Sequence, residues 1–279
     1  MSLPVESLNC VTMPMNENLS LRLYRDNQPN CLETASLQKG LVLVYKGKEL
    51  IEEGIGFGVP IIKNRDKTFF SSKAQVKVHR EGESYGLEKR FLLDTVSRKR
   101  FYKAYVNDNF YKIIHKLFEK AYLGHNNLLS VNNKIMELRE ALKIKTEFEQ
   151  VKPQGVVTVK FTCKEKAIEI TVDFSPLRLN DCMEFLVLNE QGANNFGYYS
   201  DADGLRLVGS KIGAWDRVYA HQAELTNANG TLAFTLENKA SARLFRGWEK
   251  TRNRFCWAGL SYSIYPSASI FDYTVKLKF

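Results

Sequence analysis

The segment with the greatest chemical potential is Arg243–Trp257, which concentrates arginine and tryptophan around one acid, Glu249. It reads RLFRGWEKTRNRFCW. The guanidinium group of arginine binds a carboxylate, sulfate or phosphate through two parallel hydrogen bonds. Tryptophan rings stack on sugar rings or bases. An acidic or neutral sugar site needs this mixture. The alternative is a β-hairpin with a basic loop and two core tryptophans. The predicted ligand-binding residues are Arg246, Trp248, Arg252, Arg254 and Trp257, with Trp215 as a further stacking platform.

Candidates for acid–base chemistry are few, because the chain has only four histidines. His79 and His221 fall on predicted strands, and Glu249 lies in the basic segment. A histidine or carboxylate within reach of a substrate proton can act as acid or base. A solvated surface group is the alternative for each of the three. Sequence spacing does not pair them in space, so the question of catalysis stays open.

Two polar or glycine-rich segments could suggest bound ions or cofactors. Asp201 and Asp203 in FGYYSDADG supply oxygen ligands of the kind calcium prefers, but the twelve-residue EF-hand pattern is absent. A polar turn explains them better, and no metal is expected. Gly54, Gly56 and Gly58 are spaced GxGxG rather than GxGxxG, without a following helix or P-loop lysine. They predict tight backbone packing or a bulged strand, and no cofactor is expected.

Length, charge and hydropathy narrow the class of protein. The 279 residues suffice for one large β domain, and 44% of them are hydrophobic, which is ordinary globular composition. A net charge of +9 favours anionic partners, although it also serves solubility alone. The five cysteines include no CxxC pair, so no zinc site is indicated. No apolar run reaches membrane-spanning length, and residues 1–15 lack a signal-peptide pattern, so we expect a cytoplasmic protein with no membrane partner.

Alternation of apolar and polar residues with a period of two dominates the chain, as in half-buried antiparallel strands. The clearest hairpin joins Val157–Cys163 to Ile168–Phe174 through Lys164-Glu165-Lys166. Further strands are predicted at residues 19–23, 41–45, 74–78, 232–236 and 271–279. The pattern predicts a mainly β protein, a large antiparallel β-sandwich forming a single domain over residues 1–279.

One region departs from this pattern. Residues 108–144 carry apolar side chains three and four apart, which predicts a two-helix insertion, with Asp108 and Ser130 as N-caps. Glu149–Gly155 is the predicted linker after it. No alternation of strands and helices appears, which argues against a doubly wound α/β fold.

The order of elements in Leu19–Ile62 resembles a known architecture. LSLRLYRDNQPNCLETASLQKGLVLVYKGKELIEEGIGFGVPII gives a strand, a second element, a polar hairpin and a glycine-rich stretch. Together with the terminal FDYTVKLKF, it is similar to the galactose-mutarotase-like super-sandwich proteins, which include aldose epimerases and polysaccharide lyase domains. The resemblance implies a ligand on a concave sheet face. It does not extend to the epimerase Asn-His motif, which is absent, so mutarotase activity is not expected.

Three hypotheses on function follow. The first is a carbohydrate-binding or carbohydrate-active protein of super-sandwich type, with an acidic or neutral saccharide as partner. The second is a module that binds polyanions such as nucleic acid. This hypothesis ranks lower, because the second basic segment of the chain, Lys89–Lys103, is explained by a solvated sheet face. The third is a non-catalytic structural or assembly protein. The oligomeric state is open in all three.

Overall fold

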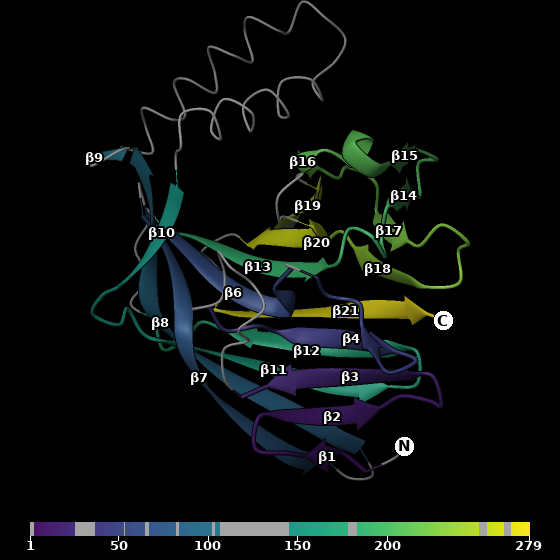
Figure 1. Ribbon diagram of the computed structural model, residues 1–279, viewed down its shortest axis with the longest axis horizontal. Helices are drawn as coiled ribbons and strands as arrows, with labels where there is room; N and C mark the ends of the chain where they lie inside the picture. The colour runs from purple at the N-terminus through teal and green to yellow at the C-terminus, as the bar shows by residue number, and fades with distance from the viewer. Residues whose placement is uncertain are drawn as a thin grey trace, which may run out of the picture.

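The protein is built from antiparallel strands in two layers (Figure 1). Every strand pair within the described residues is antiparallel. Among these residues no helix is long and apolar enough to span a membrane. The computed structural model describes residues 3–25, 37–52, 54–64, 67–81, 84–101, 104–106, 145–177, 183–250, 256–264 and 269–279.

The first layer joins N-terminal strands to strands from the C-terminal half of the chain. In hydrogen-bonding order its strands are β1 (Val5–Glu6), β2 (Cys10–Pro14), β3 (Leu19–Tyr24), β4 (Leu41–Tyr45), β6 (Gly56–Asn64), β13 (Met183–Gln191), β20 (Cys256–Ile264), β19 (Ala242–Lys250) and β16 (Ala214–Arg217). The short β5 (Lys48–Glu49) pairs with β4, and the 3₁₀ turn η1 (Gly209–Ile212) precedes β16.

The second layer contains the long central hairpin and the terminal strand. Its order is β7 (Lys67–Glu81), β8 (Ser84–Phe101), β11 (Val156–Lys164), β12 (Ala167–Asp173), β21 (Ile270–Lys278), β18 (Ala233–Glu237), β17 (Gln222–Thr226), β14 (Tyr198–Asp201) and β15 (Arg206–Val208). Two more strands, β9 (Ala104–Val106) and β10 (Lys145–Gln150), pair with the far part of β8.

The layers are continuous where β6 leads into β7. Ile62 pairs with Phe69 there, and the register between β7 and β8 shifts on both sides of Ser71. Asp94 on β8 is buried at this bend and accepts hydrogen bonds from the backbone N–H and hydroxyl of Ser72, each at 2.8 Å. A buried carboxylate requires such partners, so Asp94 is assigned to the bend.

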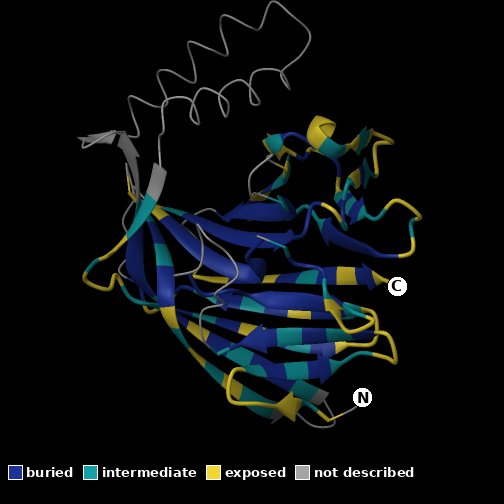
Figure 2. Ribbon diagram, in the orientation of Figure 1, coloured by how far each residue is buried: buried dark blue, intermediate teal, exposed yellow. Residues whose placement is uncertain are grey.

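The core lies between the layers and follows the alternation seen in the sequence. Phe161, Ile170 and Val275 of the second layer are inaccessible, and Phe57 of the first layer meets Phe234 of the second with ring centroids 5.1 Å apart. Figure 2 shows buried residues in the strands of both layers, interleaved in many strands with intermediate and exposed ones. Burial of this apolar surface is the main favourable term in folding.

The glycine-rich stretch forms a bulged strand, as the sequence predicts. Val59 pairs with Leu188 and Phe57 with Asn189, so Gly58 is the extra residue, at φ 75°. A Cβ on Gly40 would lie 1.9 Å from the carbonyl oxygen of Phe57, so the backbones approach too closely for any other residue.

The predicted strands at residues 19–23, 41–45, 157–163, 168–174, 232–236 and 271–279 are confirmed to within about two residues at each end, whereas the one predicted at 74–78 is the central part of the longer β7, Lys67–Glu81. The predicted linker, Glu149–Gly155, overlaps the connection between β10, which ends at Gln150, and β11, which begins at Val156. The two-helix insertion at residues 108–144 lies outside the described residues. The single-domain organisation stays a prediction.

Candidate functional site

The outer face of four first-layer strands, β13, β20, β19 and β16, combines aromatic rings with carboxyl groups. Strand geometry sets this face: Val187, Leu244 and Tyr262 point into the core and are inaccessible, so their chain neighbours point outward. We call the outward set the site face. It comprises Glu184, Leu186, Leu188, Glu190, Trp215, Arg243, Phe245, Gly247, Glu249, Trp257, Gly259, Ser261 and Ser263, with Lys63 of β6 at its edge.

Three aromatic side chains lie next to one another on the site face. The Trp215 ring centroid lies 6.1 Å from that of Trp257 and 6.5 Å from that of Phe245. Trp215 is 40% exposed, while Trp257 is buried. A Cβ on Gly247 would lie 2.4 Å from the Trp257 ring, so the glycine makes room for that ring over β19. Figure 1 places β16, the strand that carries Trp215, above β19 and β20.

Two carboxyl groups lie next to these rings in different environments. Glu249 accepts a hydrogen bond of 2.9 Å from the Trp257 indole N–H. Glu190 is buried beside Gly259, whose Cβ would lie 2.9 Å from the Glu190 Cγ. Burial is the largest cause that raises the pKa of Glu190 to about 8; a hydrogen bond from the Ile55 amide opposes the rise, and the charge of Glu249 adds to it. Near neutral pH, Glu190 is therefore a hydrogen-bond donor.

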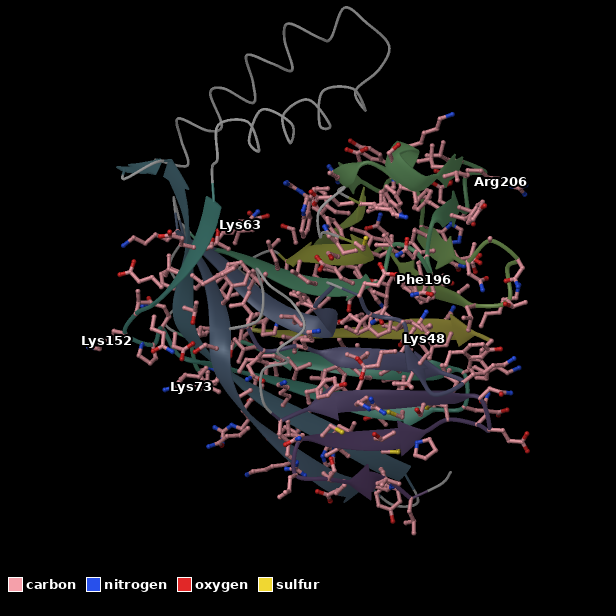
Figure 3. All side chains as sticks on the ribbon, viewed as in Figure 1. Lys48, Lys63, Lys73, Lys152, Phe196 and Arg206 are labelled. Carbon is pink, nitrogen blue, oxygen red and sulfur yellow. The ribbon has the colours of Figure 1, made fainter. Side chains whose placement is uncertain are left out.

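The opposite end of the site face is polar. The Ser263 hydroxyl donates to Glu184 at 2.6 Å, and the Ser261 hydroxyl accepts from the backbone N–H of Asn189 at 3.3 Å. The Lys63 ammonium lies 6.0 Å from the Trp215 ring centroid, and Figure 3 shows Lys63 on the first layer above β13. The face thus offers aromatic stacking together with donors and acceptors.

The structure divides the predicted ligand-binding residues between two sides of β19. Trp215 and Trp257 meet on the site face, together with the predicted acid Glu249. Arg246 and Trp248 point to the other side: the Arg246 Nε donates to the Ile212 carbonyl at 2.9 Å, and the Trp248 indole donates to the Ala193 carbonyl at 3.2 Å. Arg252 and Arg254 lie outside the described residues.

The two histidine candidates lie apart from the site face. His79 is on β7 in the second layer, where its ring covers Gly86: a Cβ there would be 2.3 Å from the His79 Nε2. His221 is exposed, immediately before β17, and its charge contributes to lowering the pKa of Glu237. The structure therefore does not bring either histidine to Glu249.

Asp201 and Asp203 form the turn between β14 and β15. The Asp201 carboxylate accepts hydrogen bonds from the Tyr199 hydroxyl at 2.9 Å and from the backbone N–H groups of Asp203 and Leu205, each at 3.1 Å. These bonds are those of an aspartate that organises a turn. Within the described part of the chain, no group of three or more His, Cys, Asp or Glu side chains is arranged to hold a metal ion.

Sequence reasoning missed Glu190. It follows Phe185–Leu188, a run of apolar residues on both faces of β13, and such a run conceals the period of two that identified the other strands. The available signal was an acid within a strand that is apolar on both faces. A carboxyl group is rarely buried there without a partner or a shifted pKa.

Comparison with known proteins finds similarity of architecture. No protein-family model matches the chain, and no curated protein matches it in sequence. The solved structures similar to it include alpha-N-acetylgalactosaminidase NagBb of Bifidobacterium bifidum in complex with GalNAc, at 8% identity and TM-score 0.49 over 95% of this chain and 35% of that one. A galactose mutarotase-like protein of Lactobacillus casei matches at 10% identity and TM-score 0.42, over 96% of this chain and 99% of that one.

The chain spans about a third of the length of NagBb. At such identities and TM-scores the similarity concerns the fold, and no conclusion about chemistry is taken from it.

Proposed function

We propose that the site face binds a saccharide. The observation that supports this most directly is the Trp215–Trp257 pair, with ring centroids 6.1 Å apart, beside Glu249 and Glu190. A sugar ring has an apolar C–H face and a rim of hydroxyls. Aromatic rings stack on the C–H face, and hydrogen-bond donors and acceptors bind the hydroxyls.

The two carboxyl groups give the face complementary hydrogen-bonding capacity. Glu249 accepts hydrogen bonds from hydroxyls, whereas protonated Glu190 donates one. The same combination, one neutral and one ionised carboxyl, is what general acid–base chemistry on a glycoside requires. A screen for saccharide binding should therefore also measure product formation. A saccharide that binds and is not converted would indicate a binding protein rather than an enzyme.

The polyanion hypothesis has less support from the described residues. It rests on the basic excess of the chain, and one of its arginines, Arg246, donates to backbone carbonyls on the side of β19 away from the site face. The site face combines Lys63 and Arg243 with the carboxyl groups of Glu184 and Glu249 and with Glu190, which burial keeps protonated near neutral pH, so its charges are of both signs. Such a face does not favour a phosphate backbone.

The test is calorimetric binding of neutral and acidic saccharides to the wild type and to Trp215→Ala. Loss of one stacking ring is worth about 1 kcal/mol, so affinity should fall about fivefold. Tyr198→Ala is the matched control, because Tyr198 is 39% exposed but lies on β14 in the second layer. Absence of binding by every saccharide, or an equal loss in the control, would overturn the proposal.

A further inference from the structure

The backbone at Trp215 has an uncommon conformation. Trp215 has φ 66°, in the left-handed region that bulky residues rarely adopt, and it is the bulged residue between Ala214 and Asp216 opposite β19. A strained residue of this kind persists only where its surroundings fix it. The bulge also turns the Trp215 side chain onto the site face, beside Trp257.

One side chain contacts the backbone on both sides of this bulge. Arg246 donates from Nε to the Ile212 carbonyl at 2.9 Å and from Nη1 to the Arg217 carbonyl at 3.3 Å. These carbonyls lie three residues before and two residues after Trp215 in the chain. The Arg246 Nη2 also lies 3.6 Å from the Asp216 carboxylate. The planar guanidinium thus joins both ends of the segment that carries the tryptophan.

Arg246 is itself held in place from the second layer. Its guanidinium carbon lies 5.0 Å from the centroid of the Tyr199 ring, and the Tyr199 hydroxyl donates to Asp201 at 2.9 Å. The Arg246 side chain is only 14% exposed. Because it alternates with Phe245 and Gly247 along β19, it lies on the side of the strand away from the site face.

We propose that Arg246 is a positioning residue, which fixes Trp215 as a stacking platform by binding the carbonyls of Ile212 and Arg217 and does not itself touch the ligand. This assignment differs from the sequence-based one, in which Arg246 binds an anionic group of the ligand directly. The proposal has two consequences, one for ligand affinity and one for the conformation of Trp215. The effect on affinity rests on the proposed saccharide binding at the site face, whereas the effect on the conformation of Trp215 does not.

The conformational part is tested without a ligand. Two indoles 6.1 Å apart with ring planes at 46° should give a coupled circular dichroism signal. Trp215→Phe should abolish this signal, and Arg246→Lys should reduce it, since one ammonium does not bind two carbonyls in a fixed plane. Arg22→Lys is the matched control, a partly buried arginine on β3 paired with Glu49. An unchanged signal in Arg246→Lys would overturn the proposal.

The affinity part is tested by a double-mutant cycle with a saccharide that binds the wild type. Trp215→Ala and Arg246→Lys should each weaken binding about fivefold, and the double variant also about fivefold, because both remove the same platform. Additive losses, about 25-fold in the double variant, would mean that Arg246 acts separately and would overturn the proposal.

Two further outcomes keep the tests distinct. Should Arg246→Lys fail to melt cooperatively, Asp216→Ala replaces it, because it removes only the Nη2 partner of Arg246 and should reduce the dichroism signal partially. No reduction there would again count against the proposal. If no saccharide binds but the dichroism signal changes as expected, saccharide binding fails while the positioning role of Arg246 is supported.

Discussion

The two layers pack around one core, but the side chains that point away from the core differ between them. The outer face of the second layer is solvated and its charges are paired: Lys276 contacts Glu237 at 2.6 Å, and Lys164 contacts Glu169. The outer face of the first layer is buried over β6, β13 and β20, where Leu186 and Leu188 form a second apolar cluster with Ile55, Val59 and Ile61. The two outer faces therefore differ in burial and in the surroundings of their charged groups.

A buried outer face that retains carboxyl groups has an energetic cost. Glu190 has its pKa raised by burial, whereas Glu237 on the solvated face has its pKa lowered by a hydrogen bond from Lys276. A chain selected for stability alone would place an apolar residue at position 190. The retained carboxyl groups therefore agree with a binding role for the first layer.

The largest expected effect tests whether the second layer depends on its terminal strand. β21 pairs with β12 on one side and β18 on the other, and Phe271, Tyr273 and Val275 are buried. Removing residues 271–279 should unfold the protein, because both neighbouring strands lose their partner and the core is opened. The measurement is circular dichroism with thermal melting. A soluble truncation that melts cooperatively would contradict the prediction.

The next effect compares one charged substitution on each outer face. Leu188→Lys places an ammonium in the buried apolar cluster and should lower the free energy of unfolding by at least about 3 kcal/mol. Thr171→Lys, on β12 beside Asp272, should change it by no more than about 0.5 kcal/mol. Urea denaturation of both variants measures the contrast, and similar losses would show that the two outer faces are equivalent.

An intermediate, pH-dependent effect is expected for Glu190→Gln. The pKa of Glu190 rises from 4.5 to about 8 on folding, so between these values the folded state keeps a proton that the unfolded state has lost. The contribution of Glu190 to the free energy of unfolding therefore falls by about 1.4 kcal/mol for each pH unit as the pH rises between these values. The fall ends above the pKa of the folded state.

Glutamine resembles the protonated acid but does not titrate, so residue 190 no longer makes the stability of the variant depend on pH. The variant should equal the wild type near the lower end of this window and exceed it in stability at the upper end. Urea denaturation at a series of pH values measures the difference, with Glu249→Gln as the comparison on the same face. A constant difference across the window would contradict the burial of Glu190.

The smallest effect concerns the solvated face. Lys276→Ala removes the partner of Glu237 and should cost less than about 1 kcal/mol, as exposed ion pairs do. The pKa of Glu237 is lowered in the folded state, so this stabilisation is present above the ordinary glutamate pKa and is lost as the pH falls. The trend is opposite to that of Glu190. Lys278→Ala, two residues along the same face, is the control, and a larger loss than Lys276→Ala in neutral buffer would refute the pairing.

The sequence predicted the second layer better than the first. Ile168, Ile170 and Val172 alternate with polar residues because one side of β12 faces water, and the hairpin with β11 follows. β13 and β20 are buried on both faces, so their period is hidden and the strands went unassigned. The site was predicted in part for the same reason: Trp215, Trp257 and Glu249 were identified by residue type, and Glu190 was not.

By itself, the sequence determined that this is an antiparallel β-sandwich, and it singled out tryptophans and arginines as candidates for ligand binding and Glu249 as a candidate acid. Those properties reside in local alternation and residue chemistry. Only the tertiary structure decided that Arg246 and Trp248 lie on one side of β19 while Trp257 lies on the other, and that Glu190 comes close to Glu249. Strand register and pairing between distant segments set those relations, and neither is encoded in local spacing.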